Sequence, residues 1–217
     1  MPTPSGRIVY KLSSTVMNGT QTLAWMDGGK RVRQDTDSKL SQPPGGASGR
    51  PPMPAGGMSL KSWTIVDGGF AYMSFPMLGP EIRKMDLKKA AGRRTGPGGV
   101  PAVTIGKEQV GKSLGKGKIA GRDCTIMEMK SQTGQVAGKV WIWQNLPLKL
   151  ELITPVTTMT LEATRVETPA RLDAGTFKLP AGVKVVDFDP SQLRQGGGMA
   201  PGGAPRPGPG RGGMAPG

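Results

Sequence analysis

The residue types that usually carry acid–base, nucleophilic or metal chemistry are scarce in this chain. Its 217 residues include no histidine and one cysteine, Cys124. Histidine is the usual proton carrier near neutral pH and the commonest metal ligand, so we expect no His-dependent triad and no metal site. Paired carboxylates facing one cleft would allow hydrolysis, but the 15 acidic residues are scattered. The sequence therefore predicts a protein that is not an enzyme and uses no cofactor.

Cys124 begins the run Cys124-Thr125-Ile126-Met127-Glu128-Met129, which has the composition of a β-strand. Only Arg122 lies close enough in sequence to lower the pKa of the thiol. We therefore interpret Cys124 as a small buried strand residue. One cysteine cannot form an internal disulfide, so the cysteine content does not indicate a redox compartment.

Basic residues form the strongest charge signal. Lys and Arg number 29 against 15 acidic residues, a net charge of +14, and half of this excess falls between Glu81 and Asp123. Such a surplus favours polyanions or an acidic membrane surface, although a Gly-rich connecting region made soluble by lysine has the same composition. The candidates for an anion-facing surface are Arg83, Lys84, Lys88, Lys89, Arg93 and Arg94.

Two segments contain too much glycine and proline to pack as regular elements. Residues 41–58 predict a disordered Pro/Gly loop insertion, and residues 191–217, in which MAPG occurs twice, predict a disordered tail. Arg206 and Arg211 resemble RGG-type RNA-binding segments, but the aromatic residues of such segments are missing. Nucleic acid is therefore not the expected partner. Outside the tail, a single antiparallel β domain is expected over residues 1–190.

No run of about 18 apolar residues predicts a membrane-spanning helix. The first seven residues, MPTPSGR, also lack the apolar stretch of a secretory signal. Two expectations remain open: a cytoplasmic protein, or the mature form of an exported one.

Between the Gly/Pro-rich segments, the pattern is that of β-strands. Asp27-Gly28-Gly29 and Asp67-Gly68-Gly69 each separate β-prone arms, and Asp-Gly is a strong hairpin signal because tight turns need positive φ. Later strands are expected at 118–130, 139–144, 148–154 and 157–167, with period-two patterns that bury one face. The run Val140-Trp141-Ile142-Trp143 is apolar on both faces, so it should be covered on both sides.

Helices are expected to be few. The segment 80–92 has Pro near its start, basic residues late and Gly at its end, which predicts a helix. Residues 104–114 and a last turn at 189–193 are further candidates.

The C-terminal half resembles a known family. The carrying motifs are Gly121-Arg122-Asp123-Cys124, Lys139-Val140-Trp141-Ile142-Trp143, Leu146-Pro147-Leu148-Lys149 and Phe177-Lys178-Leu179-Pro180-Ala181-Gly182-Val183. Their order is similar to that of the lipoprotein-localisation-factor (LolA/LolB-like) superfamily, nearest to its uncharacterised bacterial envelope proteins. The resemblance implies a mainly β fold: a curved, incompletely closed antiparallel half-barrel capped by short helices. It also implies a periplasmic or cell-envelope location and an apolar concave side that binds acyl chains or lipoprotein lipids.

Met and Trp would suit a tolerant apolar lining of such a sheet. The candidate ligand-binding residues are Trp25, Trp63, Met73, Met127, Met129, Trp141 and Trp143. The leading hypothesis is a noncatalytic envelope protein that binds a lipid, an acylated protein or a partner chain in the concave sheet, with an anionic membrane surface nearby. The alternative is a polyanion-binding or scaffolding module that uses residues 83–122 and the Arg-bearing tail. The sequence does not indicate an oligomeric state.

Overall fold

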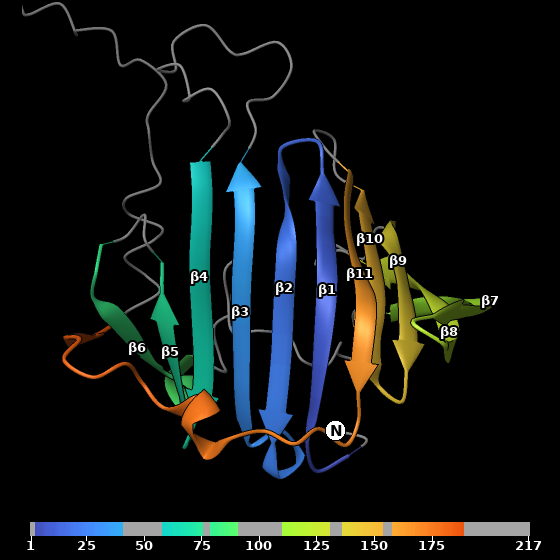
Figure 1. Ribbon diagram of the computed structural model, residues 1–217. Coiled ribbons are helices and arrows are strands. Elements are labelled where there is room, and N and C mark those ends of the chain that lie inside the picture. Colours follow the sequence, from blue (N-terminus) through green and yellow to red (C-terminus); the bar gives the residue numbers. More distant parts are fainter. Residues whose placement is uncertain are drawn as a thin grey trace, which may run out of the picture.

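The computed structural model describes residues 3–40, 58–75, 79–90, 110–130, 136–153 and 158–188. These residues form one sheet with the strand order β12-β6-β5-β4-β3-β2-β1-β11-β10-β9-β8-β7 (Figure 1). The strands are β1 (Gly6–Ser14), β2 (Met17–Met26), β3 (Arg31–Leu40), β4 (Met58–Asp67), β5 (Phe70–Ser74), β6 (Ile82–Asp86), β7 (Val110–Ile119), β8 (Arg122–Lys130), β9 (Val136–Trp143), β10 (Leu146–Ile153), β11 (Thr158–Glu167) and β12 (Val185–Asp187). The helical elements in these ranges are η1 (Asp27–Gly29), α1 (Leu87–Ala90) and η4 (Ala174–Phe177).

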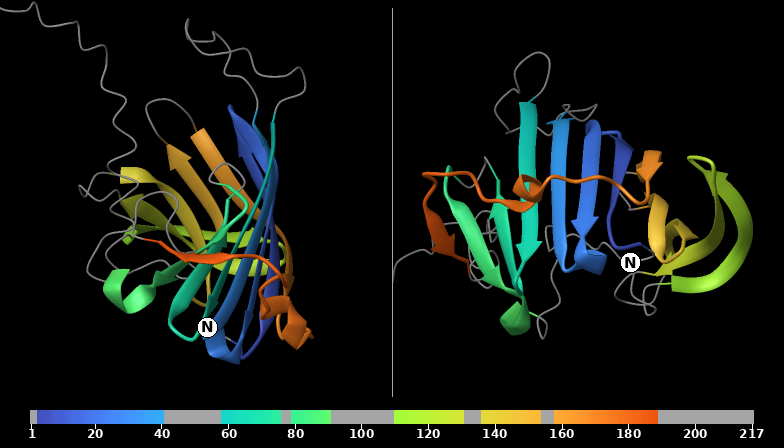
Figure 2. Two further views of the ribbon diagram at one scale, coloured as in Figure 1. Left: turned by 90° about the vertical axis from the view of Figure 1, so that its left-hand side faces the viewer. Right: turned by 60° about the horizontal axis from the view of Figure 1, so that its bottom comes forward.

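Two meanders build the sheet. Strands β1 to β6 follow one another in space, as do β7 to β11, and β1 pairs with β11 to join the two sets. All neighbouring strands are antiparallel except β12 and β6. The ends of the sheet, β12 and β7, are not paired with each other, and both bend to the same side (Figure 2). The predicted fold class, a curved antiparallel sheet that does not close into a barrel, is therefore confirmed.

The Asp-Gly-Gly turns occur where the sequence predicts them. Gly68 and Gly69 have φ values of 58° and 85° and connect β4 to β5. Positive φ at two successive residues matches the twist of a tight hairpin and costs glycine little. Asp27 and Gly28 also have positive φ, at 56° and 67°, between β2 and β3.

The helix predicted over 80–92 is wrong. Residues Ile82–Asp86 form β6, and only Leu87–Ala90 are helical. Ile82 and Met85 are buried, at 1% and 3% exposure, and the amide of Ile82 donates to the carbonyl of Lys184. Strand pairing on both sides and burial of both faces outweigh the local capping signals, which contribute only weakly.

Two further expectations need correction or fall outside the described ranges. Val110–Ile119 form β7, so the C-terminal part of the helix expected over 104–114 is a strand. The strand expected over 118–130 is divided by the Ala120–Gly121 turn between β7 and β8. Residues 104–109, the last turn at 189–193, the tail at 191–217 and all of the 41–58 loop except Met58 lie outside the described residues.

The two faces of the sheet differ in what covers them. The sheet edges bend away from one face, which is the convex face. The segment from residue 168 to 188 crosses this face (Figures 1 and 2). Arg33 on that face donates from Nη1 to the carbonyl of Thr176, and the guanidinium of Arg31 lies 5.5 Å from the Phe177 ring centroid. Val32, between the two arginines, points to the opposite, concave face.

The concave face holds the main hydrophobic core. It is a cluster of buried side chains from both meanders, made of Ile8, Tyr10, Leu23, Trp25, Val32, Ile119, Cys124, Leu146, Leu148 and Ala163. Trp25 is fully buried and lies against Gly6, where any added Cβ would overlap its indole ring. A smaller cluster of Ala71, Met73 and Met85 lies toward the β12 edge.

Candidate ligand-binding face

An apolar row crosses the concave face of five strands. Residues directly opposite each other in paired strands project to the same face, and the register aligns one apolar side chain per strand from β8 to β1. The row consists of Met127, Val140, Leu150, Leu161 and Leu12.

A second row lies two residues away along each strand, where β8 and β10 end and β9 and β11 begin. It consists of Met129, Gly138, Leu152 and Met159. Gly138 has a φ of 151°, and a Cβ at this position would overlap the backbone oxygen of Glu151. Glycine inside a strand permits close backbone approach and a tight bend, so Gly138 allows the sheet to curve beneath the methionines.

Burial falls along the strands from one end of the concave face to the other. The start of β1, the end of β2 and the start of β10 lie at the lower end of the sheet in Figure 1. The residues Ile8, Trp25, Leu146 and Leu148 in these parts of the strands have no measurable exposure, so side chains fill this half. At the upper end the apolar side chains are only half-buried: Met127, Met129, Leu150, Leu152, Met159 and Leu161. The concave face thus combines a packed core with a partly open apolar surface.

The open apolar surface does not extend evenly across the sheet. On the concave face of β2 and β3, the row that reaches β1 at Leu12 continues with Gly19 and Ser38, which offer no large apolar side chain. An apolar ligand therefore finds continuous apolar side chains only over the strands from β8 to β1.

The seven predicted ligand-binding residues lie in different places. Met127 and Met129 belong to the half-buried apolar surface. Trp25 and Met73 are buried in the main and smaller clusters. Trp63 lies on the convex face, beside Asp35 in the register. The structure therefore brings two of these seven residues together at the open surface.

The Trp141 and Trp143 side chains are half-buried and carry cations on their rings. The Nζ atom of Lys149 lies 4.9 Å from the Trp141 ring centroid, and the guanidinium of Arg122 lies 4.9 Å from that of Trp143. Both indoles pack against the main core cluster. Cation–π contacts of this kind stabilise partly exposed rings, so coverage of this strand is polar as well as apolar.

Four lining residues were not among the predicted ligand residues: Leu150, Leu152, Met159 and Leu161. Their period-two spacing identified them as one face of two strands, but spacing alone does not separate a filled core from an open surface. The cross-strand register places these residues in the same rows as Met127 and Met129, and their partial exposure separates them from the filled core.

The predicted anion-facing residues are divided. Arg83 lies 5.5 Å from the Phe188 ring centroid and Lys84 4.2 Å from that of Phe70, while Lys88 and Lys89 are exposed. Arg93 and Arg94 lie outside the described residues. The basic stretch also includes β7, which is one edge of the sheet, whereas β6 lies beside β12, the opposite edge.

Reactive groups are few in the part of the chain that the structure describes. Cys124 is buried, and desolvation raises the pKa of its thiol. Within the described ranges, no three acidic or cysteine side chains gather as a metal site requires. The helices among these residues are all too short to cross a bilayer.

Comparisons with known proteins bear on the fold. No protein-family model and no curated protein matches the sequence. An uncharacterised conserved protein of Thermus thermophilus matches 86% of this chain and 93% of its own, with 11% identity and a TM-score of 0.50. MucB matches with 15% identity and a TM-score of 0.45, over 84% of this chain and 60% of MucB. LprF of Mycobacterium bovis matches with 10% identity and a TM-score of 0.36, over 78% of this chain and 89% of LprF.

At 11% identity, the likeness to the Thermus protein concerns the fold alone. That fold is a single large curved antiparallel sheet with few, short helices and free edges. This architecture is consistent with the LolA-like fold that the sequence motifs imply.

Proposed function

We propose that the protein is noncatalytic and binds an acyl chain or a similar hydrophobic ligand on the open half of its concave face. The observation that carries this proposal is the pair of apolar rows on β8 to β11, whose methionine and leucine side chains remain half-buried while the lower half of the same face is filled. A partly exposed, contiguous apolar surface on a curved sheet favours a binding role.

The energetics suit a ligand without polar anchors. Each buried methylene contributes about 0.8 kcal/mol, so about ten of them contribute about 8 kcal/mol before the cost of ordering. Methionine is suited to a tolerant lining because its unbranched side chain adapts to different shapes. Met127, Met129 and Met159 line this surface together with leucines.

The proposal is tested by mass spectrometry and by a fluorescent probe. Native mass spectrometry and solvent extraction of the purified protein should reveal co-purified lipid. The delipidated protein should enhance the fluorescence of N-phenyl-1-naphthylamine, and Met159→Asp should weaken that binding at least about tenfold, because it places a charge on the apolar face.

Thr160→Asp is the matched control. Thr160 is the next residue of β11, is half-buried to a similar degree and projects to the opposite face, in line with Ser13 and Glu151. It should leave probe binding unchanged. Absence of lipid and of probe binding in the folded protein, or equal loss in both variants, would contradict the proposal.

A further inference from the structure

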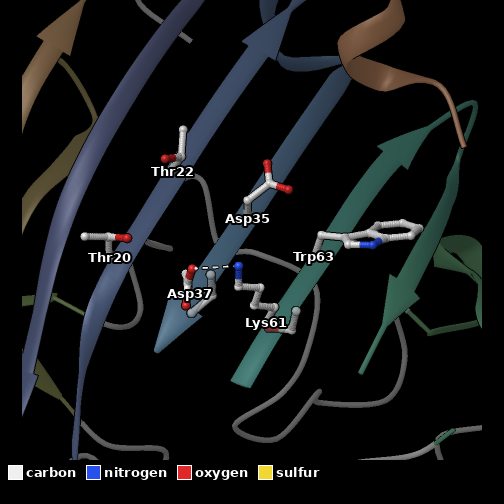
Figure 3. A pocket seen from close by; sticks show the side chains of 8 residues that line it. Thr20, Thr22, Asp35, Asp37, Lys61 and Trp63 are labelled. Atoms are coloured by element: carbon white, nitrogen blue, oxygen red, sulfur yellow. Dashed lines mark ion pairs between the residues drawn. The ribbon is translucent and has the colours of Figure 1, made fainter. Parts of the chain in front are cut away.

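A hollow on the convex face lies between β2, β3 and β4, on the side of the sheet away from the apolar surface. Its volume is about 290 Å³, at the small end of the range for ligand pockets. The side chains that line it on this face are polar apart from one indole: Thr20, Thr22, Asp35, Asp37, Lys61 and Trp63. Figure 3 shows the labelled side chains of three neighbouring strands on one face of the sheet.

Arg33 contacts both central groups of this hollow, the Asp35 carboxylate and the Trp63 ring. Nε and Nη2 of Arg33 each donate to Asp35 at 2.8 Å, and its guanidinium lies 5.9 Å from the Trp63 ring centroid. The same side chain donates to the carbonyl of Thr176, which ties it to η4. A carboxylate and an aromatic ring held by one bidentate, anchored arginine are set in place before any ligand arrives.

The hollow also has unused hydrogen-bonding capacity. Among the described residues, the hydroxyls of Thr20 and Thr22 have no hydrogen-bond partner, and a carboxylate such as Asp35 offers about four acceptor sites. Asp37 and Lys61 are 3.5 Å apart and mostly exposed, a longer contact than a strong charge-assisted bond of about 2.7–2.9 Å. Hydroxyl, carboxylate and ammonium groups around the half-buried Trp63 indole are therefore available for hydrogen bonds to a ligand.

We propose that this hollow binds a neutral saccharide. A sugar ring presents an apolar C–H face, which suits Trp63, and a rim of hydroxyls that donate to Asp35 or Asp37 and accept from Lys61 or the threonines. The charges of Arg33, Asp35, Asp37 and Lys61 sum to zero, so a neutral ligand fits better than an anionic one. The volume suits about one or two sugar rings.

Isothermal titration calorimetry with three neutral oligosaccharides tests the inference: cellotetraose, maltotetraose and the tetramer of N-acetylglucosamine. One of them should bind with a Kd of about 1 mM or tighter, the range of a small polar site. Trp63→Ala should weaken that binding at least about tenfold. Thr22→Val, which keeps side-chain volume and β propensity, should weaken it several-fold even if Trp63→Ala does not fold.

Trp141→Phe is the matched aromatic control, because Trp141 shares the face of Lys149 outside the hollow. It should leave sugar binding unchanged. No heat with any of the three sugars at about 10 mM, or binding that both hollow variants leave intact, would overturn the inference. Heat with an anionic heparin tetrasaccharide alone would also overturn it and would indicate the basic surface instead. None of these outcomes depends on acyl-chain binding, which uses the other face.

Discussion

The buried environment of Tyr10 allows a clear prediction about stability. Its hydroxyl donates to the carbonyl of Pro147 at 2.9 Å, although the two residues are 137 positions apart. The side chain is 3% exposed within the main core. Tyr10→Phe leaves the Pro147 carbonyl without this donor, so we expect the free energy of unfolding to fall by about 1–3 kcal/mol, measured by urea denaturation.

The burial of Tyr10 also leads us to expect a loss of stability at high pH. Desolvation raises the pKa of Tyr10 well above its ordinary value of about 10. The unfolded chain releases this proton above about pH 10 and the folded chain does not, so stability is full below that pH and falls as pH rises further. Tyr10→Phe should reduce this alkaline slope. An unaltered slope in Tyr10→Phe would contradict the argument.

At the level of strands, the convex face carries a row of alternating charges across the second meander. The register pairs Lys11 with Glu162 and Glu162 with Lys149, and it also pairs Glu151 with Lys139 and Lys139 with Glu128. Lys149 forms ion pairs with Glu162 across the strands and with Glu151 two residues along β10, which connects the two sets. Opposite charges directly across paired strands stabilise a register, and a one-residue slip would break every pair. The row therefore helps to specify which strands pair and how.

Lys149 is the member of this row that should matter most. It is 19% exposed, lies 3.0 Å from each carboxylate and covers the Trp141 ring. Partial burial lowers the pKa of Lys149, but Glu162 and Glu151 together raise it above its ordinary value. Lys149→Ala should cost about 1–2 kcal/mol by denaturation, because the carboxylates lose their cation and the ring loses its cover. Lys61→Ala, which breaks an exposed pair, should cost less than about 0.5 kcal/mol.

Two glycines should respond to substitution for different reasons. Gly19 faces the backbone of β3, and an added Cβ would overlap the Asp37 carbonyl, so Gly19→Ala forces the strands apart. Gly68 has open space around it but a φ of 58°, which costs an alanine about 1–2 kcal/mol. We expect Gly19→Ala to lower the melting temperature more than Gly68→Ala. The reverse order would show that β2 and β3 yield easily at this point.

Elements with strong local signals were predictable, and elements decided by distant partners were not. The Asp-Gly-Gly turns and the alternating strand β11 depend on local stereochemistry and one buried face, so their sequence was sufficient. Ile82–Asp86 have helix-like local composition but pair with β5 and with β12, about a hundred residues later. The candidate site shows the same division, since Met127 was identifiable from the sequence, while the register was needed to place Leu150, two strands away, in the same row.

For the molecule as a whole, an open sheet of this size has two edges to protect. The β7 edge carries Lys112, Lys116 and Lys118, and its sequence VGKSLGKGKI contains three glycines. Charged, glycine-rich edge strands resist pairing with another chain. The molecule therefore keeps its β7 edge polar and its open apolar surface on the concave side, an arrangement that favours binding a small ligand over adding strands at that edge.

Ligand binding to the open half of the concave face should stabilise the whole molecule, because the two apolar rows join strands from β8 to β1. A ligand that binds only the folded state adds about 2.7 kcal/mol at one hundred times its Kd. For a chain of this size that is a rise in melting temperature of about 5–10 °C. Oleate, added below its micelle concentration to delipidated protein, should produce such a rise by circular dichroism. Met159→Asp should abolish the rise and Thr160→Asp should keep it, whereas an equal shift in both variants would mean that oleate binds away from the apolar rows.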